Sequence, residues 1–274
     1  MKAKATAILA LLFCGAVHLH AAILMHRYSF SADASDSVGT ANGSNVGAVM
    51  FTGGQAIFPS GPSRTNYLSL PPSIGTEIQS STSITIELWF TRTANAPWSK
   101  VFMFGLDSGV SSAIDALEFT PAKGDPSGRS KVEASVDSVA YVWGRNDTSE
   151  ASPIYSLGGQ HYVTAVFDTS ADSISFYSDG ALSGTAPFPS SFTDLSMPQL
   201  FLGASVGWND PDFAGSLNEF RVWNGSLNAS EVLSHSSLGP DSIPEPTSGI
   251  LLLSATALLL RRRPVRQAAE RVTS

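Results

Sequence analysis

An aromatic side chain followed closely by amide and carboxylate groups has the chemistry to bind a sugar. Trp208 offers a flat apolar ring, and Asn209, Asp210 and Asp212 offer polar groups for sugar hydroxyls. Sites for small ligands combine an apolar surface with a few fixed polar groups. This segment is therefore a candidate ligand-binding loop.

A second combination of the same kind contains Trp143 and Asn146. In both segments an alternative stays open, because the aromatic ring can belong to the core and Asn, Asp and Pro are common in turns for backbone reasons. Trp89 and Trp223 lie in segments with strand character, and we expect both to be packed.

A possible nucleophile is Ser205, since residues 203–207 match the G-x-S-x-G pattern and Asp212 and His235 follow in hydrolase order. That pattern acts at a strand-to-helix turn of a parallel α/β sheet. Here a polar loop follows instead. The match therefore does not predict a hydrolase.

Paired carboxylates for glycoside hydrolysis are also missing from any single predicted strand. Such hydrolysis needs two carboxyl groups close together. Asp115 and Glu118 are three residues apart, which places them on opposite faces of a strand, and Glu87 and Glu219 are each alone on theirs. The sequence predicts a protein that is not an enzyme, with a glycoside hydrolase-like domain as an alternative.

Charge and cysteine content exclude other classes. The chain of 274 residues has 16 Lys and Arg against 23 Asp and Glu, and an arginine cluster at its C-terminus leaves the middle still more acidic. Such a surface repels a phosphate backbone, so we expect no nucleic-acid partner. The single cysteine, Cys14, precludes an intramolecular disulfide, and the histidines at 26, 161 and 235 lack zinc-ligand spacing.

The elements that must position these groups are short strands. Apolar residues alternate with period two at 84–90, and again at 163–167, where Ile174 and Phe176 continue the pattern as a hairpin. Asp179 and Gly180 mark a tight turn. Further strands are expected at 101–105, 117–120, 131–136, 139–143, 199–202 and 216–223.

One short helix is expected at 229–235, where Asn228 and Glu231 form a capping box. Many short strands separated by Gly, Pro, Ser and Asp turns predict an all-β fold. We expect a jelly-roll sandwich of two antiparallel sheets with one short C-terminal helix.

The N-terminus, residues 1–22, is typical of a signal peptide. Lys2 and Lys4 precede an apolar run at 5–17, and small residues at 21–22 suit cleavage. A lipoprotein signal would need a small residue before Cys14, where the chain has phenylalanine. The run is too short for an anchor, so we expect export.

The C-terminal segment, residues 239–274, has three features in order: a Pro-Glu-Pro box, an apolar run and an arginine cluster. They are Pro244, Glu245 and Pro246, residues 250–260, and Arg261, Arg262 and Arg263. Arginines stay on the cytoplasmic side of a membrane, which places the preceding domain outside. An ordinary tail anchor is the alternative.

This arrangement resembles the PEP-CTERM sorting signal of Gram-negative bacteria that produce exopolysaccharide. The resemblance implies transient anchoring in the inner membrane and processing near the Pro-Glu-Pro box by an exosortase. It also implies a location in the cell envelope or secretion.

The middle of the chain, assigned here to residues 23–238, resembles LamG-like jelly-roll domains of the concanavalin A-like lectin and glucanase superfamily. The resemblance is carried by the segments HRYSF (26–30), DSVG (36–39), ITIELWF (84–90), HYVTAVFDTSADSISFYSDG (161–180) and FAGSLNEFRVWNGSLNASEV (213–232). It implies the sandwich fold more securely than any activity.

The same resemblance implies a structural calcium between the first loop and the last strand. The matching positions are Asp36 and Asn218. An amide in place of a carboxylate weakens such a site. Calcium is therefore the one cofactor we consider.

Together these features predict an exported, non-catalytic module at the cell surface that binds a polysaccharide or cell-surface glycan. A structural matrix protein without a glycan ligand is the alternative. The ligand and the oligomeric state do not follow from the sequence.

Overall fold

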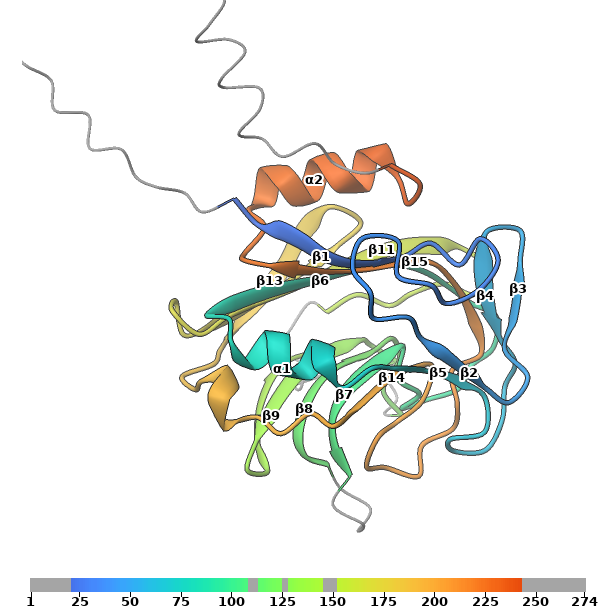
Figure 1. Ribbon diagram of the computed structural model, residues 1–274, viewed down its shortest axis with the longest axis horizontal. Coiled ribbons are helices and arrows are strands. Elements are labelled where there is room, and N and C mark those ends of the chain that lie inside the picture. The colour runs from blue at the N-terminus through green and yellow to red at the C-terminus, as the bar shows by residue number, and fades with distance from the viewer. Residues whose placement is uncertain (1–20, 108–112, 125–127, 145–151, 243–274) are drawn as a thin grey trace, which may run out of the picture.

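The computed structural model describes residues 21–107, 113–124, 128–144 and 152–242. Two antiparallel sheets, sheet A and sheet B, pack face to face in these residues (Figure 1). Nearly all of the expected signal peptide, the Pro-Glu-Pro box with its arginines, and Asn146 lie outside the described residues.

Sheet A has eight strands. In spatial order they are β13 (Ala181–Pro187), β12 (Ser173–Ser178), β11 (Gln160–Asp168), β6 (Ser83–Arg92), β15 (Gly215–Asn224), β4 (Gln55–Phe58) and β3 (Met50–Thr52), with β1 (Ile23–Tyr28) off this path. β1 and β4 pair with different parts of β15, since β4 reaches Leu217 and β1 begins its pairing at Phe220. A bulge in β15 at Asn218 separates the two parts.

Sheet B has seven strands. Their order is β10 (Val139–Trp143), β9 (Lys131–Val136), β8 (Ala113–Thr120), β7 (Phe102–Asp107), β14 (Gln199–Leu202), β5 (Tyr67–Leu70) and β2 (Ser44–Val46). The all-β jelly-roll sandwich expected from the sequence is confirmed.

Alternation along the strands builds one core between the sheets. In β6, Ile84, Ile86 and Leu88 face the core, whereas Trp89 belongs to a cluster on the other side of the sheet. Aromatic rings join the two layers, as where Phe90 of sheet A meets Phe119 of sheet B edge to face at 5.5 Å. Burial of this apolar surface is the main favourable term in folding.

The described residues also form three short helices: α1 (Ser73–Gln79), the 3-10 helix η1 (Phe192–Asp194) and α2 (Ala229–Leu238). α1 buries Ile74 and Ile78 at the side of the sandwich, and α2 covers part of the outer side of sheet A (Figure 1). The capping box predicted for α2 is confirmed, since Asn228 accepts from Glu231 N and Glu231 bonds back to Asn228 N.

The strands predicted from alternation are present, with small changes at their ends. β9, β10 and β14 have the predicted bounds. β8 begins four residues earlier than predicted, β7 is shifted by one or two residues, and β6 and β15 are one or two residues longer at each end. The hairpin of β11 and β12 is confirmed, as is the turn at Asp179 and Gly180, which both have positive φ. The strands β1 to β5 and β13 and the helices α1 and η1 were not predicted.

Candidate functional site

The outer face of sheet B carries a connected cluster of charged side chains. Lys131 Nζ lies 2.8 Å from Glu118 Oε1 and 2.7 Å from Glu133 Oε2. Lys100 Nζ lies 3.2 Å from the same Glu118 oxygen and 3.6 Å from Asp210 Oδ2. We call these five residues the sheet B cluster.

Strand register explains this cluster. Leu117 and Phe119 of β8 face the core, so Glu118 between them faces outward, and it lies directly opposite Glu133 of β9. Like charges at opposed positions repel. Lys131, two residues before Glu133 and so on the same face, places its ammonium group between the two carboxylates.

The charges shift one another's pKa values. Burial alone would raise the pKa of Glu118, but the charges of Lys100 and Lys131 outweigh burial and hold that pKa at about 2. Burial would likewise lower the pKa of Lys131, but Glu118 and Glu133 raise it above its usual range. Burial is the main cause of the raised pKa of Asp210, and Lys100 partly offsets it.

Trp98 borders this cluster on one side. Its ring centroid lies 5.7 Å from Lys131 Nζ, a cation–π contact, and its side chain is 38% exposed. Its φ is +66°, which costs energy for a bulky residue. A Cβ on Gly124 would overlap the indole ring, so the glycine makes room for it.

Trp208 lies two residues before Asp210, which belongs to the cluster. It is 41% exposed. Its backbone is fixed at both ends, because its N–H donates to Ser205 Oγ at 3.1 Å and its carbonyl accepts from Ser63 Oγ at 3.1 Å. Asn209 beside it is exposed. The structure thus places Trp208, Asn209 and Asp210 together at the edge of the sheet B cluster.

Asp212 has a different role from the one expected. It is fully buried, and its carboxylate accepts from the backbone N–H groups of Arg64, Thr65 and Asn66 at 2.7 to 2.9 Å. Its oxygens are therefore used to fix the loop before β5. This corrects the prediction that Asp212 contacts a ligand.

The G-x-S-x-G segment lacks the context of a nucleophile elbow. Ser205 is buried, its Oγ lies 3.6 Å from Met103 Sδ, and the next element along the chain is the strand β15. His235 lies on α2 and contacts Glu87 of sheet A, while Asp212 fixes another loop. Ser205, Asp212 and His235 therefore make separate structural contacts and do not form a catalytic triad.

Trp143, the centre of the rival combination, lies in β10 and is partly buried against the core. Its ring fills the space next to Gly184 of β13. Since Asn146 lies outside the described residues, a ligand contact by this pair stays a prediction.

The residues expected to hold calcium do not fit that ion. The Asp36 carboxylate already accepts from the backbone N–H groups of Arg27, Gly39 and Ala41 at 2.9 to 3.1 Å and contacts His26 Nδ1 at 2.7 Å. Asn218 lies in the bulge of β15 and donates to Gln160 Oε1 at 3.1 Å. Asp36 organises its own loop instead.

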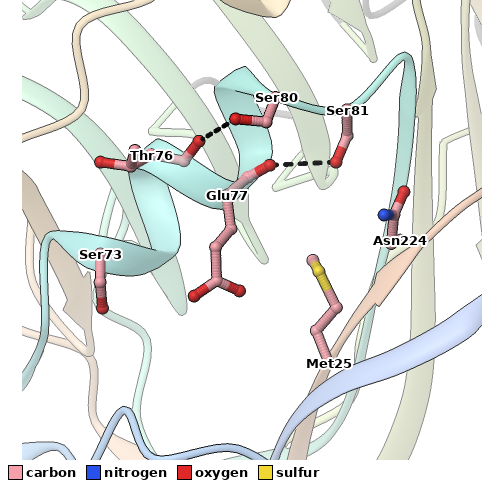
Figure 2. Close-up of a pocket in the computed structure, with 7 residues that line it drawn as sticks. All are labelled: Met25, Ser73, Thr76, Glu77, Ser80, Ser81 and Asn224. Atoms are coloured by element: carbon pink, nitrogen blue, oxygen red, sulfur yellow. Dashed lines mark hydrogen bonds between the residues drawn. The ribbon is translucent and has the colours of Figure 1, made fainter.

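No group of three or more His, Cys, Asp or Glu side chains in the described residues could hold a metal ion. A concavity lies beside α1, with a volume of about 500 Å³. Figure 2 shows Glu77 pointing into this space, with Met25 and Asn224 on the other side. His26, buried between Asp36 and Glu77, contacts the Glu77 carboxylate at 3.0 Å.

On the outer face of sheet A, two carboxylates that are far apart in the sequence, Glu87 and Glu219, contact the same arginine. Glu87 accepts from Trp223 Nε1 at 2.5 Å, from the Tyr162 hydroxyl, and contacts His235 Nδ1 at 2.9 Å. Arg221 lies directly opposite Glu87 in the register and contacts both Glu87 and Glu219. We call Glu87, Glu219, Arg221 and His235 the sheet A hub.

Trp89 and Trp223 are packed around this hub, as predicted, and are 2% and 5% exposed. The register of β6, β11 and β15, rather than any local motif, creates the hub. For Trp98, the only signal in the sequence is a tryptophan after Pro97 in a short polar segment.

The fold and these faces define a class of protein. Residues 62–233 match the family model Laminin_G_3 of the concanavalin A-like lectin/glucanases superfamily, which is more than half of the chain. The chain therefore belongs to the concanavalin A-like lectin/glucanase superfamily. No curated protein sequence matches it significantly.

Solved structures show the same fold at low sequence identity. One is domain 4 of AbnA, an extracellular arabinanase of Geobacillus stearothermophilus, in complex with arabinotriose (19% identity, TM-score 0.61, covering 78% of this chain and 98% of that one). A leech intramolecular trans-sialidase (15%, 0.53, 74% and 28%) is another. A third is botulinum neurotoxin type C, whose cell entry depends on two ganglioside molecules (12%, 0.54, 80% and 51%).

The chain spans only 28% of the sialidase and 51% of the toxin chain. Among the described residues, no helix has the length and apolar character needed to cross a membrane.

Proposed function

We propose that this protein is an exported, non-catalytic module that binds a glycan on the outer face of sheet B. One observation carries the proposal. Two exposed tryptophans are connected to the sheet B cluster: Trp98 makes a cation–π contact with Lys131, and Trp208 lies two residues before Asp210, which contacts Lys100.

The chemistry of this face suits a sugar. An exposed indole ring offers an apolar surface for the C–H groups of a pyranose or furanose ring, and fixed polar groups orient the hydroxyls. Glu133 and Asp210 are partly exposed, and Asn209 is exposed, so each can bond to a hydroxyl at the rim. The strained backbone of Trp98 supports a functional role, because such strain gathers at ligand sites.

The carboxylate pair Glu118 and Glu133 supports binding rather than hydrolysis. Retaining hydrolysis needs one carboxyl group as a proton donor and a second one free to attack the sugar. Both carboxylates contact the Lys131 ammonium group, and Glu118 is buried with a pKa of about 2. A group with so low a pKa does not donate a proton near neutral pH.

The structural neighbours agree with a glycan ligand. The arabinanase domain was solved in complex with arabinotriose, and cell entry of the neurotoxin depends on gangliosides. These ligands belong to those proteins, and they support the class of ligand proposed here without naming it.

Export and sorting complete the proposal. Residues 1–22 direct export, and the Pro-Glu-Pro box with the arginine cluster holds the precursor in the inner membrane until an exosortase processes it. The domain then reaches the cell envelope or the surrounding matrix. Glu245→Ala should accumulate uncleaved, membrane-bound precursor in an exosortase-bearing host, seen by fractionation and immunoblotting.

Glycan binding is tested with a protein of residues 21–242, which contains every described strand and helix. A glycan array identifies the ligand, and affinity electrophoresis in that polysaccharide compares Trp98→Ala and Trp208→Ala with Trp143→Ala. The proposal expects both of the first two variants to lose retardation and the third to keep it. No binding to any glycan would favour a structural matrix protein, and release of reducing sugar would show a hydrolase.

A further inference from the structure

The chain that follows α2 is held in the fold by one buried arginine. Arg221 is fully buried in sheet A. Its Nη2 group donates to the carbonyl oxygens of Pro240 at 2.7 Å and Ser242 at 2.5 Å. These are the last described residues of the chain, next to the Pro-Glu-Pro box.

The guanidinium group of Arg221 is held through Nε and by contact with Glu87 and Trp89. Its Nε donates to Glu219, which Arg27 also holds through two hydrogen bonds of 2.8 and 2.7 Å. Its Nη1 lies 3.8 Å from Glu87 Oε2, and its Cζ lies 4.7 Å from the centroid of the Trp89 ring. Arginine donors have a rigid fork geometry, so Nη2 is directed at the chain after α2.

The end of α2 guides the chain to this arginine. His235, in the last turn, stacks on Trp223 at 5.3 Å and contacts Glu87, which ties the helix to the sheet A hub. Gly239 ends the helix with a φ of +81°, a conformation that glycine adopts readily. The chain then turns back toward Arg221.

We propose that Arg221 is a latch that keeps residues 240–242 in the folded domain and so protects them from proteolytic processing. Hydrolysis adds one water across a peptide bond and gives a new carboxylate and a new amine. A protease must draw the chain into its active site in extended form, and the latched carbonyls resist this. Processing is thereby limited to the chain beyond Ser242, where the Pro-Glu-Pro box begins two residues on.

This inference deepens the sorting part of the proposed function but does not need it to be correct. The latch is tested in vitro with no exosortase present, whereas sorting is tested in the cell. If the digestion test fails, the sorting test can still be interpreted, and the reverse also holds.

Limited digestion of the tail-bearing protein with proteinase K, followed by intact-mass spectrometry, tests the latch. Native protein should give products that end at Ser242 or later, whereas Arg221→Gln should give products that end at Gly239 or earlier. Arg92→Gln is the matched control, since Arg92 is also buried and donates to a carbonyl, that of Tyr155, at 2.9 Å. Its products should end where those of the native protein end.

Arg221→Gln could also unfold the whole domain, so a second comparison leaves the arginine in place. Chains ending at Ser242 and at Gly239 both retain α2 and its capping glycine. The latch predicts that the shorter chain melts several degrees lower. Equal melting temperatures, or identical product ends for native protein and a folded Arg221→Gln, would overturn the proposal.

Discussion

The outer faces of sheets A and B carry the same kinds of side chain in different surroundings. Each has buried carboxylates beside a cation that lies over a tryptophan ring, Arg221 over Trp89 and Lys131 over Trp98. On sheet A the helix α2 covers part of the face (Figure 1), residues 240–242 contact Arg221, and the two tryptophans are packed. On sheet B both bordering tryptophans remain exposed.

This difference separates a structural role from a binding role. Groups on sheet A are buried and contact one another, so changes there should affect stability first. Groups on sheet B hold two aromatic rings at the surface, so changes there should affect ligand binding as well. The following variants test whether the two faces divide their roles in this way.

The largest loss of stability is expected for Glu87→Gln. This carboxylate contacts Arg221 and His235 and accepts from Trp223 and Tyr162, all away from solvent. Breaking a buried ion pair by removing one partner costs about 3 to 5 kcal/mol. Urea unfolding measures the loss, and a loss below about 1 kcal/mol would contradict the structural role of the hub.

Glu118→Gln should lower the free energy of unfolding by less than Glu87→Gln does, by about 2 kcal/mol. It removes the carboxylate shared by the two lysines, but Lys131 keeps Glu133 and Lys100 keeps Asp210. Urea unfolding of this variant beside Glu87→Gln gives the comparison directly. If both variants lose the same free energy of unfolding, the two faces do not differ in their contribution to stability.

The same glutamate makes stability depend on pH. Its pKa is held at about 2 in the fold, against its usual value of 4.5, so the unfolded chain takes up a proton before the folded one does. The contribution is complete above about pH 4.5 and is lost as the pH falls toward about 2. Unfolding free energies across this range should fall more steeply for native protein than for Glu118→Gln, and parallel curves would refute the assignment.

Trp208→Ala should weaken glycan binding with little effect on folding. An exposed ring contributes little to the core, so we expect a stability change below about 1 kcal/mol. Loss of its stacking should weaken binding about tenfold, which equals about 1.4 kcal/mol. Calorimetry and thermal melting measure both; a melting temperature lowered by many degrees would show that Trp208 is a core residue.

The smallest effect on stability is a difference between two variants of Trp98. Glycine adopts a positive φ without the penalty that alanine has, so Trp98→Gly should be about 1 kcal/mol more stable than Trp98→Ala. Both should lose glycan binding to the same extent. If alanine is the more stable substitution, the backbone strain at Trp98 is not relieved by glycine and carries no functional meaning.

Elements whose signal lies within a short stretch of the chain can be predicted from the sequence. Alternation marks β6, β11 and β12, and the capping box marks α2, because each signal lies within the element itself. The short strands β2 and β3 have too few residues to show a period.

The sites depend on pairing between distant strands, which a single sequence does not reveal. Glu118 and Glu133 come together through the register of β8 and β9, and Arg221 meets Glu87 through that of β15 and β6. Asp212 illustrates the opposite error. Its neighbours in the chain suggested a ligand site, but its carboxylate turns inward to the loop before β5.

The most direct test of the proposed site uses the indole N–H signals of the five tryptophans in an isotope-labelled protein. Each tryptophan reports on one place: Trp98 and Trp208 on sheet B, Trp89 and Trp223 on sheet A, and Trp143 on the rival segment. Titration with the oligosaccharide identified by the array should shift the signals of Trp98 and Trp208 and leave the other three in place. A shift of Trp143 alone, or of Trp89 and Trp223, with Trp98 and Trp208 unchanged, would contradict the account.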